Sequence, residues 1–223
     1  MTEHRYYIDG KRVPGVTTII DGIGWNKGAL LYWSNKAGLD GADLETARRE
    51  ALGDGTRVHG WIDEFCRRGN ILIDDFDLKS GAHNAFAGWL GWYAGKVLTK
   101  MIIEQPITCR ELRCGGRPDL IGVENGRICV YDWKTYKGDD GTKEPYAEYW
   151  VQAAAYAAMH YMENGQLIDD LVIVMLNKTT GEAHEYRVPV LSDKADAAFA
   201  AFKHARELYD LRKQLTKKEE GWE

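Results

Sequence analysis

The feature that most constrains the fold is an Asn-Gly pair, Asn125-Gly126, between two strand-like segments. These segments, RPDLIGVE (117–124) and RICVYDWK (127–134), are rich in β-branched and apolar residues. Asn-Gly favours a two-residue hairpin turn, because both of its positions adopt a positive φ readily. The length of that turn sets the register of the two strands, so Asp119 is predicted to lie directly opposite Asp132.

This register gathers charge at the open end of the hairpin. Alternate side chains of a strand share a face, so Lys134 lies on the same face as Asp132. Two opposed carboxylates beside apolar residues repel each other and lose solvation, and a divalent cation such as Mg²⁺ or Mn²⁺ offsets that cost. A neighbouring ammonium can stabilise charge on a phosphate oxygen. The pattern indicates metal-assisted hydrolysis of a phosphodiester, and an Asp–Lys–Asp ion cluster without a catalytic role is the alternative.

The other segments predict an α/β or α+β chain, with a central mixed sheet flanked by helices. Before the hairpin we expect a strand-like start (6–20), helices at 27–37, 42–51, after Thr56 as N-cap and at 81–101, and a strand at 102–110. After the hairpin we expect a helix at 146–163, strands at 170–177 and 183–190, and a helix at 193–216.

No linker, repeat or low-complexity block divides the 223 residues, so we expect a single domain. Within it we distinguish a mostly helical N-terminal part (1–101), a sheet and helix (102–190) and a C-terminal helix (191–223). The net charge of −5 disfavours coating of nucleic acid by bulk charge, but it allows a local basic groove beside an acidic site.

The compartment is expected to be the cytoplasm. The chain has no apolar run long enough for a membrane span and no apolar signal core near its start. Its cysteines form no C-x-x-C pair and an intracellular setting disfavours disulfides, so we expect buried, unreactive thiols at Cys66, Cys109, Cys114 and Cys129.

Four short motifs follow one another along the chain. They are GTRVHGWID (55–63), GGRPDLIG (115–122), VYDWKT (130–135) and a Q-x-x-x-Y pair formed by Gln152 and Tyr156. Together they resemble the PD-(D/E)xK nuclease superfamily, in particular its RecB-like exonuclease branch, which is common in bacteriophages. VPGVTTII (13–20) and LYWSNKAG (31–38) also look like the start of such proteins, so the resemblance covers most of residues 13–156.

The resemblance implies a restriction-endonuclease-like core and specific roles in the site. Asp119, Asp132 and the backbone carbonyl of Trp133 would hold Mg²⁺ or Mn²⁺, and Lys134 would be the catalytic lysine. His59 would be a further metal ligand, although a histidine on a helix is, without the motif, more often structural.

Supporting roles are also implied. Gln152 and Tyr156 lie one helical turn apart and would contact the DNA backbone or support the site, with helix packing as the alternative. Glu104 lies where relatives often carry a glutamate and would order the site or bind a second metal. Glu111 is a competing candidate, and either residue is alternatively a solvated strand residue.

DNA contacts are expected from basic side chains near the site: Arg57, Arg110, Arg113, Arg117 and Lys137. Some relatives carry an iron–sulfur cluster held by one early and three late cysteines. No cysteine follows Cys129 here, so that cluster is not expected. The chain has neither helicase motifs nor a G-x-x-x-x-G-K-[ST] phosphate loop, so it is not expected to unwind DNA itself.

The sequence therefore predicts a metal-dependent DNA exonuclease of phage or bacterial recombination, replication or repair. DNA ends would be its substrate, and a recombination or replication protein would be a partner. A catalytically silent DNA-end-binding or scaffold module and a structure-specific endonuclease are the alternatives. A sugar hydrolase with paired carboxylates fits less well, because it has no role for Lys134.

Overall fold

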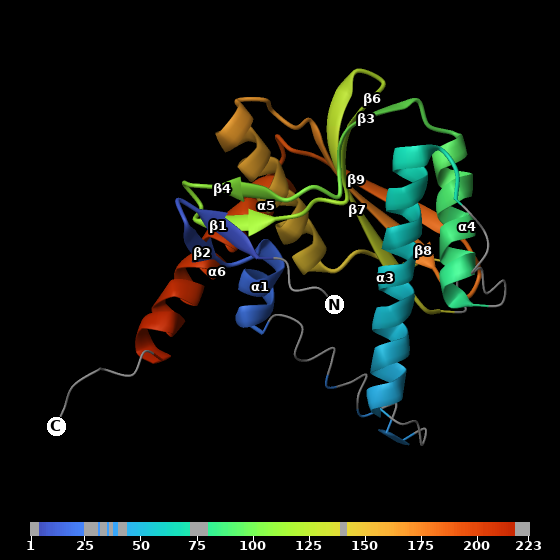
Figure 1. Cartoon of the computed structure of the whole chain (residues 1–223), viewed down its shortest axis with the longest axis horizontal. Coiled ribbons are helices and arrows are strands. Elements are labelled where there is room, and N and C mark those ends of the chain that lie inside the picture. The colour runs from blue at the N-terminus through green and yellow to red at the C-terminus, as the bar shows by residue number, and fades with distance from the viewer. Residues whose placement is uncertain are drawn as a thin grey trace.

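The fold is a three-layer sandwich in which a five-stranded mixed sheet lies between two groups of helices (Figure 1). The structure, a computed structural model, describes residues 5–24, 44–71, 80–138 and 142–216, together with positions 31, 35, 38 and 39. Along the sheet the strands are β3 (Leu98–Ile103), β6 (Leu120–Glu124), β7 (Arg127–Tyr136), β8 (Asp170–Asn177) and β9 (Ala183–Pro189). β7 and β8 are parallel, and the other neighbours are antiparallel.

Helices cover both faces of this sheet, as the predicted architecture requires. One face packs against α3 (Leu44–Arg68) and α4 (Gly81–Ala94), and the other against α5 (Ala147–Asn164) and α6 (Asp193–Thr216), on which α1 (Val16–Gly22) packs in turn (Figure 1). All residues of β8 are buried, because its alternate side chains enter two separate hydrophobic cores. This double burial explains why β8 reads in the sequence as a continuous apolar run.

The predicted hairpin is confirmed. Asn125 and Gly126 have φ values of 51° and 80°, as a two-residue turn of this kind requires. The pairing of β6 with β7 runs from Glu124 opposite Arg127 to Leu120 opposite Tyr131. The ladder therefore ends one residue short of Asp119, and strand structure is absent from 117–119, where Pro118 interrupts the predicted strand.

Two predictions for the first third of the chain are wrong in detail. The strand-like start is a hairpin of β1 (Tyr6–Ile8) and β2 (Lys11–Val13), and the helix α1 follows it directly. Pro14 and Gly15 end the strand, and the buried side chains of Val16, Ile19 and Ile20 then follow helical spacing. The helices expected at 42–51 and after Thr56 are one helix, α3, so Thr56 is not an N-cap. The helix expected at 27–37 lies outside the continuously described residues.

The boundaries around β3 are also corrected. The helix expected at 81–101 ends at Ala94, and residues from Leu98 onward pair with β6 because sheet formation outweighs helix propensity there. The strand expected at 102–110 is split by Glu104, which has a φ of 46°, and by Pro106. Its second half, β4 (Ile107–Cys109), pairs with β5 (Cys114–Gly116) in a separate small sheet.

The remaining elements match the sequence analysis closely. α5, β8, β9 and α6 are confirmed to within a residue or so at each end. All four cysteines are buried and free, as expected. Within the described part of the chain, no helix combines the length and the apolar character needed to cross a membrane.

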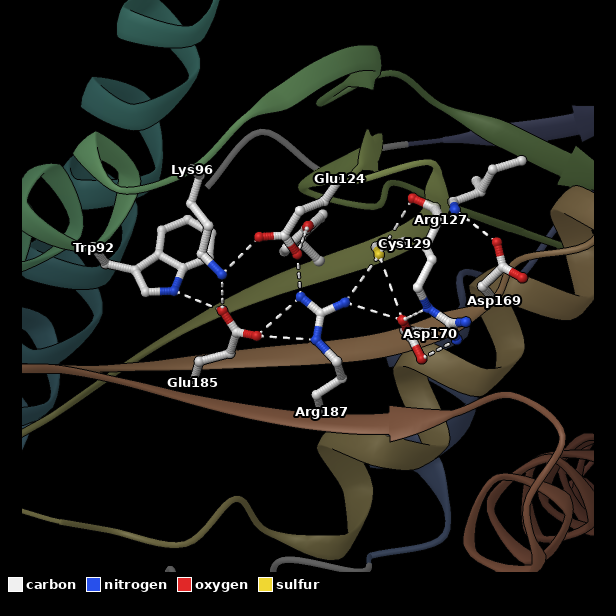
Figure 2. Close-up of polar contacts among 11 residues, drawn as sticks. Trp92, Lys96, Glu124, Arg127, Cys129, Asp169, Asp170, Glu185 and Arg187 are labelled. Carbon is white, nitrogen blue, oxygen red and sulfur yellow. Dashed lines mark hydrogen bonds and ion pairs between the residues drawn. The ribbon is translucent and has the colours of Figure 1, made fainter.

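A network of charged side chains connects neighbouring strands of the sheet at the turn end of the hairpin (Figure 2). Arg187 on β9 contacts the carboxylates of Glu124, Asp170 and Glu185, and Arg127 forms two hydrogen bonds of 2.7 and 2.8 Å to Asp170. Asp170 is buried, with 2% of its surface exposed, so its charge is stabilised mainly by these two guanidinium groups.

This network predicts acid sensitivity. Hydrogen bonds from Arg127, assisted by Arg187 and opposed by burial, hold the pKa of Asp170 below its usual range. Because the folded pKa is lower than the unfolded pKa of about 3.9, the stabilisation is complete above pH 4 and is lost as the pH falls through the folded pKa. The Asp170→Asn substitution should therefore lower the free energy of unfolding at pH 7 more than at pH 3, as measured by urea denaturation.

The exposed carboxylate of Glu207 provides the control for this comparison, because it forms a 3.5 Å surface ion pair with His204 one turn away on α6. Glu207→Gln is expected to leave stability nearly unchanged at both pH values. An effect of Asp170→Asn that does not vary with pH would contradict the assigned role of Asp170.

Candidate active site

The candidate site lies at the open end of the hairpin, where side chains from several elements converge. Asp119 immediately precedes β6, and Asp132, Trp133 and Lys134 are consecutive residues of β7. The other contributors are His59 on α3, Glu104 after β3, and Gln152 and Tyr156 on α5. Residues from distant parts of the sequence thus meet at this end of the sheet.

His59 joins the acidic residues on the α3 side. Its Nδ1 lies 3.0 Å from Asp119 Oδ1 and 3.6 Å from Glu104 Oε1, and potential metal-ligating atoms of the three side chains lie within 4.8 Å of one another. Its Nε2 lies 3.0 Å from the carbonyl oxygen of Trp133, so that carbonyl faces the same site. The Trp133 N–H in turn donates a 2.7 Å hydrogen bond to Asp119 Oδ2, which fixes the carboxylate against β7.

Lys134 and Asp132 form the α5 side of the site. Lys134 Nζ lies 2.7 Å from Asp132 Oδ2 and donates a 3.2 Å hydrogen bond to Gln152 Oε1. The amide of Gln152 donates to Asp132 Oδ1 at 3.0 Å and to the hydroxyl of Tyr156 at 3.2 Å. Gln152 therefore holds the carboxylate and the ammonium in one fixed arrangement.

Burial and charge act against each other on each titratable group. Burial opposes protonation of His59, but the Asp119 carboxylate outweighs it and raises the pKa of His59 to about 10. Burial also works against the Asp119 charge, yet the pKa of Asp119 is lowered because His59 and Lys134 stabilise the carboxylate. For Asp132 burial prevails over Lys134, so the pKa of Asp132 is raised. Burial likewise raises the pKa of Glu104, so Asp132 and Glu104 are the carboxylates of the site whose burial is not fully offset by neighbouring charges.

The donor set fits a hard divalent cation. Asp132 is buried, with its Oδ2 2.7 Å from the Lys134 ammonium, and potential ligand atoms of His59, Glu104 and Asp119 lie within 4.8 Å of one another. Carboxylate and carbonyl oxygens are the ligands that Mg²⁺ and Mn²⁺ prefer. Asp119, the Trp133 carbonyl and His59 or Glu104 would complete the coordination beside Asp132. Metal binding to His59 requires its neutral imidazole, so the proton that bridges His59 to Asp119 would have to leave.

The structure places the arginines predicted to contact DNA in different settings. Arg117 lies at the site, where its Nε contacts Glu104 Oε2 at 2.7 Å and the Glu104 carbonyl at 2.8 Å. Arg113 pairs with Asp210 on α6, whereas Arg57 is exposed on α3, two residues before His59.

The two glutamate candidates are separated by the fold. Glu104 belongs to the cluster with His59 and Asp119, whereas Glu111 is exposed in the turn between β4 and β5. Glu104 is held in its positive-φ conformation by a 3.1 Å hydrogen bond from its N–H to the Asp119 carbonyl and by Arg117. Such strain persists where the surrounding contacts enforce it.

Sequence reasoning missed two residues beside the site. The Tyr149 ring lies 5.0 Å from Lys134 Nζ, and Gly116 lies against the Tyr156 ring. Tyr149, Gln152 and Tyr156 follow one another at intervals of three and four residues on α5, so helical spacing was the signal that would have identified Tyr149.

Replacing Gly116 by alanine should disturb the site by displacing the Tyr156 ring, against which Gly116 lies. A Cβ at this position would lie 2.4 Å from Cε1 of Tyr156, whose side chain is almost fully buried. Tyr156 would have to move, and Gln152 would lose a hydrogen bond that helps to orient it. We expect Gly116→Ala to destabilise the fold by about 1–3 kcal/mol, as overpacking typically does, and to lower the cleavage rate of the folded protein.

The matched control is Gly91→Ala, because an added Cβ at this exposed position of α4 meets nothing within 4 Å. That variant should be as stable as the wild type or slightly more stable, since alanine favours helix by about 1 kcal/mol over glycine. Thermal unfolding and cleavage assays of both variants make the comparison, and equal behaviour would contradict the role given to Gly116.

Comparison with solved structures finds 18 matching chains. The crystal structure of SSO0001 is 17% identical, with a TM-score of 0.32, and the match covers 60% of this chain and 58% of SSO0001. A protein from Eubacterium rectale named "Putative exonuclease" is 14% identical, with a TM-score of 0.46, and the match covers 76% of this chain and 69% of that one. A comparison with curated proteins finds no match.

The family comparison covers most of the chain. Residues 32–220 match the PD-(D/E)XK nuclease superfamily, a range that includes every residue of the candidate site. The α/β sandwich and the acidic cluster of His59, Glu104 and Asp119 agree with this match. The chain belongs to the PD-(D/E)XK nuclease superfamily.

Proposed function

We propose that the chain is a divalent-metal-dependent DNA exonuclease that hydrolyses phosphodiester bonds. Membership of a nuclease superfamily implies a nucleic-acid substrate. The observation that carries the proposal is the cluster of His59, Glu104 and Asp119, whose potential ligand atoms lie within 4.8 Å of one another beside the buried Asp132 carboxylate. A cation bound at this cluster would neutralise phosphate charge and lower the pKa of a water molecule.

The protein's own residues would orient the reaction. The Lys134 ammonium, held by Asp132 and Gln152, would lie beside the scissile phosphate and stabilise the negative charge that develops on its oxygens. The oxygen of water would form the new bond to phosphorus as the bond to the leaving oxygen breaks. The proton that the water loses would pass to solvent, and the leaving oxygen would take up one. Asp119, fixed by the Trp133 N–H, would keep its oxygens directed into the site.

The sequence resemblance to the RecB-like branch supports exonuclease action. An exonuclease would act at DNA ends. We propose that the enzyme acts in recombination, replication or repair in the cytoplasm of a bacterium or a phage-infected host, together with a recombination or replication protein. Mg²⁺ or Mn²⁺ would be the cofactor, without an iron–sulfur cluster. The whole chain would form one nuclease domain.

The test of the exonuclease assignment compares linear and covalently closed circular DNA of the same sequence, single-stranded and double-stranded, with Mg²⁺ or Mn²⁺. We expect linear DNA to be degraded progressively from its ends while circles stay intact. Cleavage of circular DNA would contradict the exonuclease assignment and would identify the protein as an endonuclease. Binding of DNA ends without any cleavage would favour the silent end-binding module.

A further inference from the structure

Two tyrosines at the start of α5 form an aromatic pair beside the candidate site. Tyr146 is the N-cap residue of α5, its side chain is 40% exposed, and its ring centroid lies 5.5 Å from that of Tyr149 in an edge-on arrangement. Tyr149 is partly buried and packs against the core under α5. The inner ring is therefore fixed by packing, while the outer ring remains accessible to solvent.

Contacts of a few ångströms connect this pair to the site. Lys134 Nζ lies 5.0 Å from the centroid of the Tyr149 ring and 2.7 Å from Asp132 Oδ2. On the outer side, Lys143 Nζ lies 4.6 Å from the centroid of the Tyr146 ring. A continuous row thus leads from the acidic site through an ammonium and two aromatic rings to a second ammonium.

This order of groups matches the chemistry of an unpaired nucleotide. A phosphate is attracted by ammonium groups, and the base attached next to it presents a flat face that stacks on aromatic rings whatever its identity. Proteins that bind single strands combine such stacking with a positively charged path for the backbone. A base in a duplex is already stacked on both faces, so the exposed Tyr146 ring would favour an unpaired one.

We propose that Tyr146, supported by Tyr149, is a stacking platform for an unpaired base adjacent to the scissile phosphate, so that the enzyme engages a single-stranded end. The inference rests on the proposed nuclease function and deepens it by naming the form of the substrate. Lys143, whose ammonium lies 4.6 Å from the centroid of the Tyr146 ring, would contact a phosphate of the same strand next to the stacked base. Tyr146 is a binding residue in this account, and Tyr149 is a positioning residue.

The test measures binding of a short single-stranded oligonucleotide by fluorescence anisotropy, with Ca²⁺ replacing Mg²⁺. Tyr146→Ala should weaken binding about tenfold, the size of one base–aromatic stack, whereas Tyr146→Phe should bind like the wild type. Tyr161→Ala is the matched control, because Tyr161 is a 51% exposed tyrosine near the other end of the same helix. Thermal unfolding would verify that all variants are folded.

A series of oligonucleotides, each with one abasic site at a different position, distinguishes loss of base stacking from a general effect of the substitution on α5. Binding of each oligonucleotide is measured for the wild type and for Tyr146→Ala. At one position the missing base should weaken binding to the wild type but not to Tyr146→Ala. Wild-type affinity of Tyr146→Ala, or the same abasic penalty in both proteins at every position, would overturn the platform. Failure of the proposed nuclease function would give a different result. The wild type would then cleave no DNA with any metal, while the dependence of binding on Tyr146 and on the abasic position would persist.

Discussion

Replacement of Lys134 by methionine is expected to lower the rate of DNA cleavage at least about 100-fold, as loss of one charge-stabilising donor does in other enzymes. Methionine keeps much of the length of the side chain but removes the ammonium that Asp132 and Gln152 hold in place. The expected loss is in kcat, because the ammonium acts on charge that develops during the reaction. Single-turnover cleavage of end-labelled DNA measures the effect.

Lys203→Met is the matched control for this substitution. Lys203 is exposed on α6, where its ammonium lies over the Phe199 ring. That variant should cleave DNA at the wild-type rate, and circular dichroism should show both variants folded. A folded Lys134→Met protein with wild-type activity would contradict the mechanism.

The largest effect on stability is expected from Arg187→Met. Arg187 contacts three carboxylates, and its removal leaves Glu124 and Asp170 buried with reduced compensation (Figure 2). Removing one member of a buried ion pair typically costs about 3–5 kcal/mol, because the remaining charge is left in a poorly solvated place. Urea denaturation at pH 7 should show this loss in the free energy of unfolding.

The candidate site lies at the opposite end of the hairpin, so Arg187→Met should retain nuclease activity at temperatures where it is folded. Arg68→Met is the matched control, because Arg68 forms an exposed ion pair with Glu64 one turn earlier on α3. Such surface pairs contribute at most about 1 kcal/mol. Equal losses in the two variants would contradict the importance of the network.

The hairpin and its site could be predicted because their determinants are local. The Asn125-Gly126 turn sets the register from Glu124 opposite Arg127 to Leu120 opposite Tyr131, and Asp119 follows directly beyond this ladder at the same end as Asp132 and Lys134. The apolar run at 170–177 likewise predicted the strand β8, and all of its residues are buried. In these cases neighbouring residues carry the information, so one sequence is sufficient.

Other features depend on contacts between distant residues. Gly53 and Gly55 are unfavourable inside a helix, yet α3 runs continuously through them and packs against α4, which is distant in the sequence. Likewise, the end of α4 and the start of β3 depend on pairing with β6, which lies more than 20 residues further along the chain.

In the candidate site, too, some features follow from local sequence and others depend on contacts between distant residues. The backbone conformation of Glu104 is enforced by Arg117 and the Asp119 carbonyl, and no pattern around residue 104 reveals it. The contact of Tyr149 with Lys134 joins a helix to a strand, so it becomes visible once both elements are placed. Motif and register therefore predicted which acidic residues, lysine and helix residues of α5 come together, whereas the contacts of Glu104 and Tyr149 required the three-dimensional structure.

The most direct test of the account is a cleavage time course on end-labelled linear DNA with Mg²⁺, with Mn²⁺ and with EDTA, using the wild type and Asp132→Asn. The wild type should degrade the DNA with either metal and leave it intact in EDTA. Asp132→Asn should leave it intact throughout, because the carboxylate proposed to hold the cation is gone. Cleavage that persists in EDTA, or equal cleavage by the Asp132→Asn variant, would contradict a metal-dependent nuclease centred on Asp132.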